Sequence, residues 1–554
     1  MSKKKIILIL LSVFIISSIV GSIIYFYKNE KKVLKYIGDK VGYNPNDPKS
    51  KEINNNVHYN NSKRQWLYMK EDETIYFSIK DQIKGKEYTD YDRLCYIEDY
   101  DEYIYFKSRN SKILPILTWN RIYKTDDIYD ANFIYHYLYG KDLDRFLNKI
   151  NFKQKYCRFP ISDYLINKKS LYSHYLKMMN KYPDDYNFMV ESYILPQQID
   201  IFERVFKENE SINGRNIWIV KPVGLSRGMN IKIVDKLSDI IENVEIKEQV
   251  APNNNNTKNN KNNKNNKKNK NKNKVTNEPK YIIKNKKISK NGNVIVSRYI
   301  EPSTINNRKF DLKIMCLITS YDPLMVYLYD DGIVRFATEN YSEDKDKLSN
   351  KYIHLTNASV NEKNSNYIKN NDFYDLKESV SSLNAFKKYC EDNKIDYDAI
   401  LSKIKDYVIK AILSNYDSAV QDLHKYKLPS CKNIFELFGV EVILDKDYNP
   451  HLIGFNSKPE LFTNSKVGEK LYNNVICDLL NIIGIRKYNR KSMRKHRRVY
   501  TLEENLKECT KELKRYTGHF ELIFPLKNNI DKYSKFIENK TKLNTELWSY
   551  FLRN

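Results

Sequence analysis

Apolar and polar residues alternate most regularly between Phe435 and Pro459, where two apolar runs flank the turn-forming segment 445–450 (DKDYNP). Two alternating runs about such a segment predict an antiparallel hairpin. Glu441 falls on one face of the first strand, and the opposite face is apolar. That apolar face carries Phe438, Val440, Val442 and Leu444.

On the returning strand, alternation places Leu452, Gly454 and Asn456 on one face, opposite Ile453 and Phe455. Pairing about the turn sets Glu441 roughly across from Gly454 and Asn456. A carboxylate and an amide then converge on an otherwise apolar strand pair, and such hard oxygen ligands suit a magnesium ion bound to nucleotide phosphates. A buried glutamate that is hydrogen-bonded to an asparagine for structural reasons explains the same pattern equally well.

The same reading predicts strands and helices elsewhere in the chain. Short apolar runs predict strands over 216–222, 231–234, 293–300 and 311–319. Residues 324–329 and 333–337 flank Asp330-Asp331-Gly332, which is a hairpin turn signal. Helices are predicted over 162–179 and 198–206, and apolar residues at helical spacing predict a third over 400–412.

The N-terminus carries a candidate membrane segment. Residues Ile6 to Tyr27 are nearly all apolar and have lysines on both sides. About twenty such residues span a bilayer as a helix, so we expect a transmembrane anchor followed by a polar tether. A cleaved signal peptide is the alternative, although its apolar core is usually shorter and no clear cleavage site follows here. The slight excess of lysines after the apolar run favours a cytosolic body.

The charge of the chain points to an acidic partner. The 554 residues are enough for two or three domains and carry a formal net charge of +26. Residues 253–274 are almost wholly Asn and Lys and hold eight lysines, so we expect a disordered insert that loops out of the fold. The remaining +18 implies nucleic acid, an anionic membrane or an acidic protein tail, which the basic stretch 486–498 would attract. No nucleic-acid-binding motif appears, and we expect no nucleic-acid partner.

Seven cysteines are scattered along the chain, with no CxxC and no paired spacing. An odd and dispersed set fits a reducing compartment better than a disulfide framework or a zinc site.

Several charged residues have a phosphate-binding context. Lys221 closes an apolar strand and precedes a glycine-bearing loop, an arrangement that can hold phosphate oxygens, although strands ending in Lys-Pro are also common structural features. Lys309, Asp311 and Lys313 alternate along one strand face, which on its own also describes a solvated face. His354 by itself is equally a core or surface histidine.

Together these segments resemble one family, the tubulin tyrosine ligase-like enzymes, which have the ATP-grasp fold. The segments that carry the resemblance are 218–231 (WIVKPVGLSRGMNI), 299–342 (YIEPSTINNRKFDLKIMCLITSYDPLMVYLYDDGIVRFATENYS), 351–360 (KYIHLTNASV), 435–445 (FELFGVEVILD), 452–461 (LIGFNSKPEL) and 518–525 (GHFELIFP).

The resemblance implies an α/β (α+β) ATP-grasp protein with N-terminal, central and C-terminal subdomains. The expected segments are the anchor, 1–29; the tether, 30–62; the N-terminal subdomain, 63–205; the central subdomain, 206–310, with the insert; the C-terminal subdomain, 311–485; and a basic and helical extension, 486–554.

The activity implied is ATP-dependent carboxylate–amine ligation, in which ATP phosphorylates a carboxylate and an amino acid's amine attacks the acyl phosphate. Such phosphoryl transfer needs positioning and charge neutralisation more than covalent help from the protein. By the resemblance, Lys221, Arg227 and Gly228 would hold phosphates. Arg298, Tyr299 and Ile300 would form the adenine-side hinge. The pocket would be lined by Lys309, Asp311, Lys313 and Arg335 and closed by His354, Thr356 and Asn357. Glu441 and Asn456 would hold Mg²⁺.

The chain also departs from the family's pattern. The family usually has Asp at Glu441, Arg at Lys313, a second glycine at Asn230, and Gln-Lys at Ser297-Arg298. Arg forms a bidentate fork that Lys cannot. Gly454 replaces a metal-binding Glu, so one carboxylate is missing where two magnesium ions would need several.

Two hypotheses follow. In the first, the protein is a membrane-anchored, microtubule-associated ligase that adds a free amino acid, glutamate above glycine or tyrosine, to the acidic C-terminal tail of tubulin. In the second, it is a catalytically degenerate relative that still binds nucleotide or microtubules and acts as a membrane-tethered adaptor. Gly454 is the residue that separates the two hypotheses.

Overall fold

The computed structural model describes residues 131–212, 214–225, 227–249, 281–368, 375–457, 466–485, 498–515 and 517–553, together with five short stretches between residues 68 and 129. All of them belong to one compact unit, Trp66–Asn554. The expected anchor at 6–27, the tether at 30–62, the Asn/Lys tract at 253–274 and nearly all of the basic stretch 486–498 lie outside the described residues. Within the described part, no helix has both the length and the apolar character needed to cross a bilayer.

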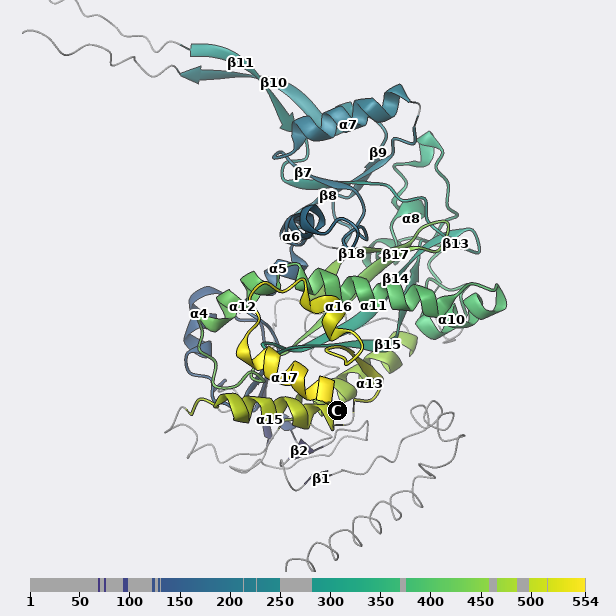
Figure 1. The fold of residues 1–554 in the computed structure, drawn as a ribbon. Coiled ribbons are helices and arrows are strands. Elements are labelled where there is room, and N and C mark those ends of the chain that lie inside the picture. Colours follow the sequence, from purple (N-terminus) through teal and green to yellow (C-terminus); the bar gives the residue numbers. More distant parts are fainter. Residues whose placement is uncertain are drawn as a thin grey trace, which may run out of the picture. The chain divides into compact units, whose positions relative to one another are not determined.

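A seven-stranded antiparallel sheet forms the centre of this mixed α/β unit (Figure 1). Its main order is β16-β15-β14-β17-β18, with β13 beside β14 and β19 beside β15. The strands are β13 (Thr304–Ile305), β14 (Arg308–Tyr321), β15 (Leu324–Phe336), β16 (Val380–Ser382), β17 (Glu436–Leu444), β18 (Pro450–Ser457) and β19 (Phe520–Phe524).

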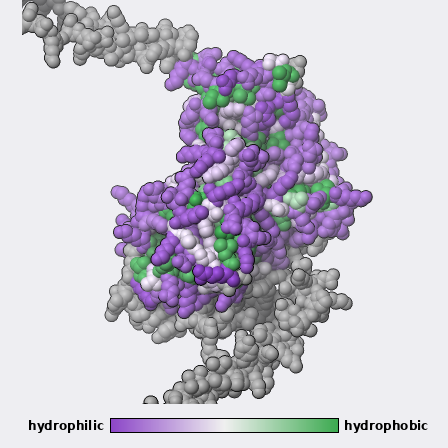
Figure 2. Space-filling model, in the orientation of Figure 1, coloured by the Kyte–Doolittle hydropathy of each residue, from purple (hydrophilic) through white to green (hydrophobic). Residues whose placement is uncertain are grey.

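Helices cover both faces of the central sheet. Alternation along β14 sends Leu312 and Ile314 to one core and Met315 and Leu317 to the other. The first core is completed by α10 (Leu383–Asp392), α11 (Tyr397–Leu413), α12 (Tyr416–His424) and α16 (Ile530–Ser534), and the second by α13 (Lys466–Ile483), α15 (Leu502–Leu513) and α17 (Lys542–Arg553). Each fully buried aliphatic side chain stabilises the fold by roughly 1.5–3 kcal/mol. The face shown in Figure 2 is correspondingly hydrophilic over most of its described surface.

A smaller antiparallel sheet carries the predicted phosphate loop. Its order is β7-β12-β8-β9, from β7 (Ser192–Leu195), β8 (Trp218–Pro222), β9 (Lys232–Val234) and β12 (Val294–Arg298). Helix α7 (Ile199–Ser211) packs on it through Phe202 and Phe206, whose rings lie 5.0 and 6.5 Å from the Trp218 ring. The predicted strands 216–222, 231–234 and 293–300 are therefore confirmed.

Beside this sheet, β10 (Ile241–Gln249) and β11 (Tyr281–Ser289) form a two-stranded ribbon, which points away from the central sheet in Figure 1. Nine residue pairs run from Ile241 opposite Ser289 to Gln249 opposite Tyr281. The residues that join the two strands include the Asn/Lys tract, and the last residue of β10, Gln249, is the register partner of the first residue of β11, Tyr281.

The N-terminal part contributes a parallel sheet of order β4-β3-β5-β6 and a short antiparallel pair, β1 with β2. Its elements are β1 (Tyr68–Met69), β2 (Thr74–Ile75), β3 (Arg93–Ile97), β4 (Ile122–Lys124), β5 (Phe133–Tyr135), α4 (Gly140–Leu147) and β6 (Lys155–Tyr156). The predicted helix 162–179 is two helices, α5 (Asp163–Ile166) and α6 (Lys168–Lys181). Asn167 separates them, because its side chain accepts the backbone amides of Lys169 and Ser170 and so caps α6.

The predicted hairpin turn at Asp330-Asp331-Gly332 is wrong. Strand β15 runs through these residues, and the chain reverses earlier, between Tyr321 and Leu324. The segment forms a bulge, in which the buried Asp331 carboxylate accepts the Gly332 amide at 2.7 Å. A side chain at Gly332 would place its Cβ 2.6 Å from the backbone oxygen of Lys313, so the glycine permits the close approach of β14.

The hairpin formed by β17 and β18 is confirmed, with Glu441 directly opposite Gly454 and Gly439 opposite Asn456. The register steps between Glu441 and Val442, and Ile453 is the extra residue of a bulge. Leu452 is therefore turned into the first core and Ile453 to the opposite face. The prediction that Leu452 shares a face with Gly454 and Asn456 is wrong for this reason.

Candidate functional site

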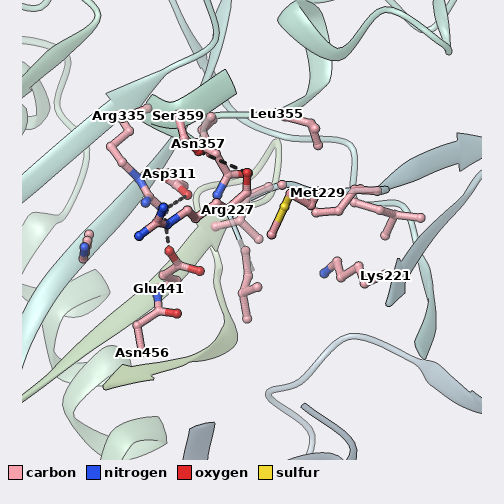
Figure 3. A pocket seen from close by; sticks show the side chains of 18 of the residues that line it. Lys221, Arg227, Met229, Asp311, Arg335, Leu355, Asn357, Ser359, Glu441 and Asn456 are labelled. Carbon is pink, nitrogen blue, oxygen red and sulfur yellow. Dashed lines mark hydrogen bonds and ion pairs between the residues drawn. The ribbon is translucent and has the colours of Figure 1, made fainter. Parts of the chain in front are cut away.

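A pocket of about 270 Å³ lies where the loop that follows β8 and contains Gly228, the predicted phosphate loop, faces strands β14, β15, β17 and β18 (Figure 3). Two short helices, α8 (Lys351–His354) and α9 (Ala358–Asn361), line another side. Most of the predicted site residues line this pocket: Lys221, Arg227, Gly228, Lys309, Asp311, Lys313, Arg335, His354, Thr356, Asn357, Glu441 and Asn456. Segments that lie more than 200 residues apart in the sequence thus meet in one cavity.

The floor of the pocket is a row of charged side chains across neighbouring strands. Asp311 lies opposite Arg335, and Lys313 lies opposite Glu441. The Arg335 guanidinium donates to both Asp311 oxygens, at 2.8 and 2.6 Å, and to Glu441 Oε1 at 2.8 Å (Figure 3). Directly paired residues share a face of a sheet, so the register brings these four side chains to one face, and Arg335 then reaches across β14 to Glu441.

These ion pairs keep the network charged despite its burial. Burial raises the pKa of Glu441, but the Arg335 and Lys313 cations and a hydrogen bond with Asn456 outweigh it, and the pKa ends below its ordinary value. Burial opposes the charge of Arg335, yet Asp311 and Glu441 raise its pKa well above the ordinary value. Glu441 and Asn456 therefore interact, and Glu441 is already engaged by Arg335; their convergence on a magnesium ion remains a prediction.

Two of the lysines that line the pocket, Lys221 and Lys309, have lowered pKa values. Burial, followed by repulsion from the Lys221 cation, lowers the pKa of Lys309 to about 7. Burial, followed by repulsion from Lys168, lowers the pKa of Lys221 to about 8. The charged forms of lysines with lowered pKa values are stabilised by an anion that enters the pocket beside them.

The predicted hinge residues lie around the pocket and not among the residues that line it. The Tyr299 hydroxyl is buried beneath the pocket, where it contacts Lys309 Nζ at 2.9 Å and His354 Nδ1 at 2.8 Å. Arg298 pairs with Glu191 at 2.7 Å and lies over the Trp218 ring, and Ile300 follows β12. Their assignment to an adenine hinge remains a prediction.

His354 is a neutral partner of Tyr299. Burial, and then the Lys309 cation, lower its pKa to about 4. The imidazole is therefore uncharged near neutral pH and helps to fix the hydroxyl that Lys309 contacts.

The loop over the pocket depends on Gly228. Its φ is +74°, and a Cβ there would lie 2.8 Å from Val360 Cγ2 and 3.0 Å from Asn357 Oδ1. Next to it, the Arg227 carbonyl accepts the Ser359 hydroxyl at 3.0 Å. Gly228 therefore lets this loop approach α9, which fixes the loop above the cavity. Two apolar residues of the loop, Leu225 and Met229, are exposed at the pocket's edge.

Sequence reasoning missed Lys168, the first residue of α6. Its Nζ donates to the Leu225 carbonyl at 3.1 Å, and burial lowers its pKa, against the attraction of Glu441. A lysine inside a predicted helix carries no functional signal, since solvent-exposed lysines are common there. The apolar part of the lining was missed as well: Ile219, Ile231, Ile443 and Ile453.

Glu441 and Asn456 offer one carboxylate and one amide oxygen to an implied magnesium ion. Among the described residues, no group of three His, Cys, Asp or Glu side chains is placed to hold a metal. Magnesium at nucleotide sites commonly takes one or two carboxylates together with phosphate oxygens and water. The residues present therefore fit one ion held largely by phosphates, and they do not fit a cage built by the protein.

Comparisons with known proteins agree with the geometry. Residues 146–493 match the model of the tubulin-tyrosine ligase family. The chain is 31% identical over 333 residues to the tubulin monoglutamylase TTLL4 of Mus musculus, covering 60% of this chain and 24% of that protein. It is 28% identical over 352 residues to the tubulin polyglutamylase TTLL5 of Mus musculus, covering 62% and 22%. A probable beta-tubulin polyglutamylase of Tetrahymena thermophila is 27% identical over 410 residues, covering 68% and 30%.

The chain thus spans about a quarter of the length of the two Mus musculus relatives. The family match nevertheless runs through β8, β14, β15, β17 and β18, the strands that line the pocket, and through well over half of the chain. On these grounds the chain belongs to the tubulin-tyrosine ligase family.

Proposed function

We propose that this protein is an ATP-dependent carboxylate–amine ligase of ATP-grasp type, which adds an amino acid, glutamate, to the acidic tail of tubulin through an acyl phosphate. The observation that carries the proposal is the cationic pocket between the phosphate loop and the central sheet. The relatives of this chain are named as tubulin glutamylases, which supports tubulin as the acceptor and a cytosolic, microtubule-associated catalytic part. The net charge of +26 favours an acidic acceptor.

The side chains of the pocket have different roles in this proposal, according to where they lie. Lys168, Lys221 and Lys309 neutralise and orient the triphosphate, and Arg335, fixed by Asp311, stabilises charge that develops on the transferred group. Neutral His354 holds Tyr299, which in turn positions Lys309. Glu441 and Asn456 would hold Mg²⁺, which supplies further charge neutralisation at the phosphates when bound.

The proposal is tested by mass spectrometry of tubulin tails. The full chain is incubated with tubulin, ATP and Mg²⁺ plus glutamate, glycine or tyrosine in separate reactions. We expect tails heavier by one or more glutamate residues and no addition with the other two amino acids. Glycine or tyrosine addition would change the amino acid assigned, and absence of any addition would reject the ligase.

Replacing Lys221 with alanine should weaken ATP binding by roughly 1.5–3 kcal/mol, about ten- to a hundredfold in Kd, because a charge-assisted contact is lost. Titration calorimetry on the full chain measures the change. Lys236→Ala is the matched control, since Lys236 is exposed on the same subdomain and does not line the pocket. Equal affinity in Lys221→Ala and Lys236→Ala would remove Lys221 from the phosphate site.

ATP affinity should fall as pH rises. The protonated lysines bind the anion, and the free pocket loses those protons near the pKa values of about 7 for Lys309 and about 8 for Lys221. Binding then takes up protons, and we expect Kd to rise roughly tenfold or more between pH 6.5 and 9. Arginine stays protonated throughout this range, so Lys309→Arg should flatten the profile. A flat profile in the unaltered protein would contradict the assignment.

One observation favours the second hypothesis, a catalytically degenerate adaptor. Gly454 leaves Glu441 without a second carboxylate on the opposing strand, and Arg335 already occupies Glu441. In that case the protein would bind ATP in this pocket without ligating any amino acid to tubulin, and residues 6–27 would tether it to a membrane. The mass-spectrometric assay combined with nucleotide titration separates the two functions.

A further inference from the structure

Two of the seven cysteines meet in the folded chain. The Sγ atoms of Cys431 and Cys509 lie 3.7 Å apart, so the two sulfurs are in contact, although 78 positions separate the residues in the sequence. Cys431 lies in the segment that leads into β17, and Cys509 lies on α15. The spacing of cysteines along the sequence could not reveal this pair, because the packing of α15 brings the two sulfurs together.

Contacts on either side hold the two thiols in place. The backbone amide of Cys431 donates to Asn505 Oδ1 at 2.9 Å, and the Cys431 thiol donates to the Asn505 carbonyl at 3.9 Å. At the next position in the segment, Lys432 Nζ pairs with Glu512 Oε2 at 3.0 Å, and both side chains are buried. Asn505, Cys509 and Glu512 are spaced four and three residues apart, so they share one face of α15. That face is docked on the segment before β17, and the docking fixes the contact between the sulfurs.

The pair needs a small movement to become a disulfide. A disulfide bond is about 2.05 Å long, so the sulfurs must approach by roughly 1.7 Å, which rotation of the two side chains can supply. Cys509 is fully buried and Cys431 is half-buried, so Cys431 is the more accessible of the two thiols. Burial, followed by the hydrogen bond with Cys509, raises the pKa of the Cys431 thiol well above its ordinary value. Because the thiolate is the reactive form, oxidation near neutral pH should take hours and not seconds.

We propose that Cys431 and Cys509 are a redox site, which forms a reversible disulfide with a two-electron oxidant of the peroxide class and so fastens α15 to the segment that leads into β17. Hydrogen peroxide oxidises the Cys431 thiol to a sulfenic acid and releases one water. The Cys509 thiol then attacks that sulfur. The S–S bond forms as the S–O bond breaks, and the hydroxyl group leaves with the Cys509 proton as a second water. The two thiols lose two protons and two electrons in total, and an added dithiol reverses the step by exchange. This inference does not depend on the proposed function.

The direct test is peptide mapping of the folded full chain after hours in hydrogen peroxide. The chain is then unfolded, its remaining thiols are alkylated, and it is digested without a reductant. We expect mass spectrometry to find one joined peptide pair that contains Cys431 and Cys509 and that dithiothreitol separates. Recovery of both cysteines in unjoined peptides, or of Cys431 joined to a different cysteine, would overturn the inference.

The melting temperature gives a second readout. The oxidised chain should melt at least about 3 °C above the reduced chain, because a bond across 78 positions restricts the unfolded chain. Cys431→Ala should abolish both the joined peptide and this difference, and Cys509→Ala removes the same bond from the other side. Cys390→Ala is the matched control, since it removes another buried cysteine and should change neither result. A difference in melting temperature that persists in Cys431→Ala, or a joined peptide without any difference, would overturn the proposed fastening of α15.

Discussion

Arg335→Met is expected to lower the free energy of unfolding by about 3–5 kcal/mol, because it leaves Asp311 and Glu441 buried without their common cation. Methionine has a similar length and packs without a charge, so the loss comes from the uncompensated carboxylates. Urea unfolding of the full chain at pH 7 measures the change. The cost should be smaller at pH 5 than at pH 8, since protonation of the two orphaned carboxylates removes the buried charge.

Two further variants isolate this cause. A triple variant that removes all three charges should recover much of the stability, as is common when a whole buried ion network is replaced. It combines Arg335→Met with Asp311→Asn and Glu441→Gln. Arg145→Met breaks an exposed pair with Asp142, whose side chains are 64% and 71% exposed, and should cost no more than about 1 kcal/mol. A cost for Arg335→Met as small as that of Arg145→Met would show that the pocket network contributes nothing to folding.

Glu441→Ala is expected to abolish ligase turnover, with a fall in kcat of at least about a hundredfold. Asp311 remains bonded to Arg335, and the change removes the only carboxylate that the described residues of β17 and β18 contribute to the pocket lining. Folding should persist, because Arg335 keeps its bidentate partner. Tail addition measured by mass spectrometry reports the rate, and thermal melting checks the fold.

The opposite strand offers a rescue. Gly454→Glu places a carboxylate across from the vacated position, where its Cβ meets open space, and should restore part of the lost turnover in the Glu441→Ala background. On its own, Gly454→Glu should raise the ligase rate of the protein. Strong activity that survives Glu441→Ala without the second change would refute the metal assignment of Glu441 and Asn456.

The hairpin, and the placement of Glu441 opposite Gly454, could be predicted from the sequence because two alternating runs flank the turn-forming segment 445–450. The bulge at Ile453 could not be predicted, because Leu452 and Ile453 are both apolar and either side chain suits the core. The prediction of a hairpin turn at Asp330-Asp331-Gly332 failed for a related reason. A glycine that lets β14 approach and a glycine that turns a hairpin look identical in sequence, and only the packing partner distinguishes them.

Most of the pocket followed from motif resemblance, because its residues lie on strands with strong local patterns. The role of Lys168 could not be predicted in this way, because Lys168 lies 273 positions before Glu441 in the chain and reaches the site only through the packing of α6. The pairing of Arg335 with both carboxylates also required the structure, because its contact with Glu441 spans β14 and does not follow from direct strand pairing.

The ribbon of β10 and β11 provides a site in the middle of the chain where another polypeptide can be inserted. Gln249 and Tyr281 are register partners, so their Cα atoms are only about 4.5–5.5 Å apart. Any polypeptide whose ends meet at that spacing can join them, and lengthening such a loop costs little, with each doubling adding only about 0.6 kcal/mol. The number of residues between these strands can therefore drift freely over evolutionary time without moving the pocket. A fluorescent domain with adjacent termini inserted there would report on the protein in a living cell while leaving its chemistry untouched.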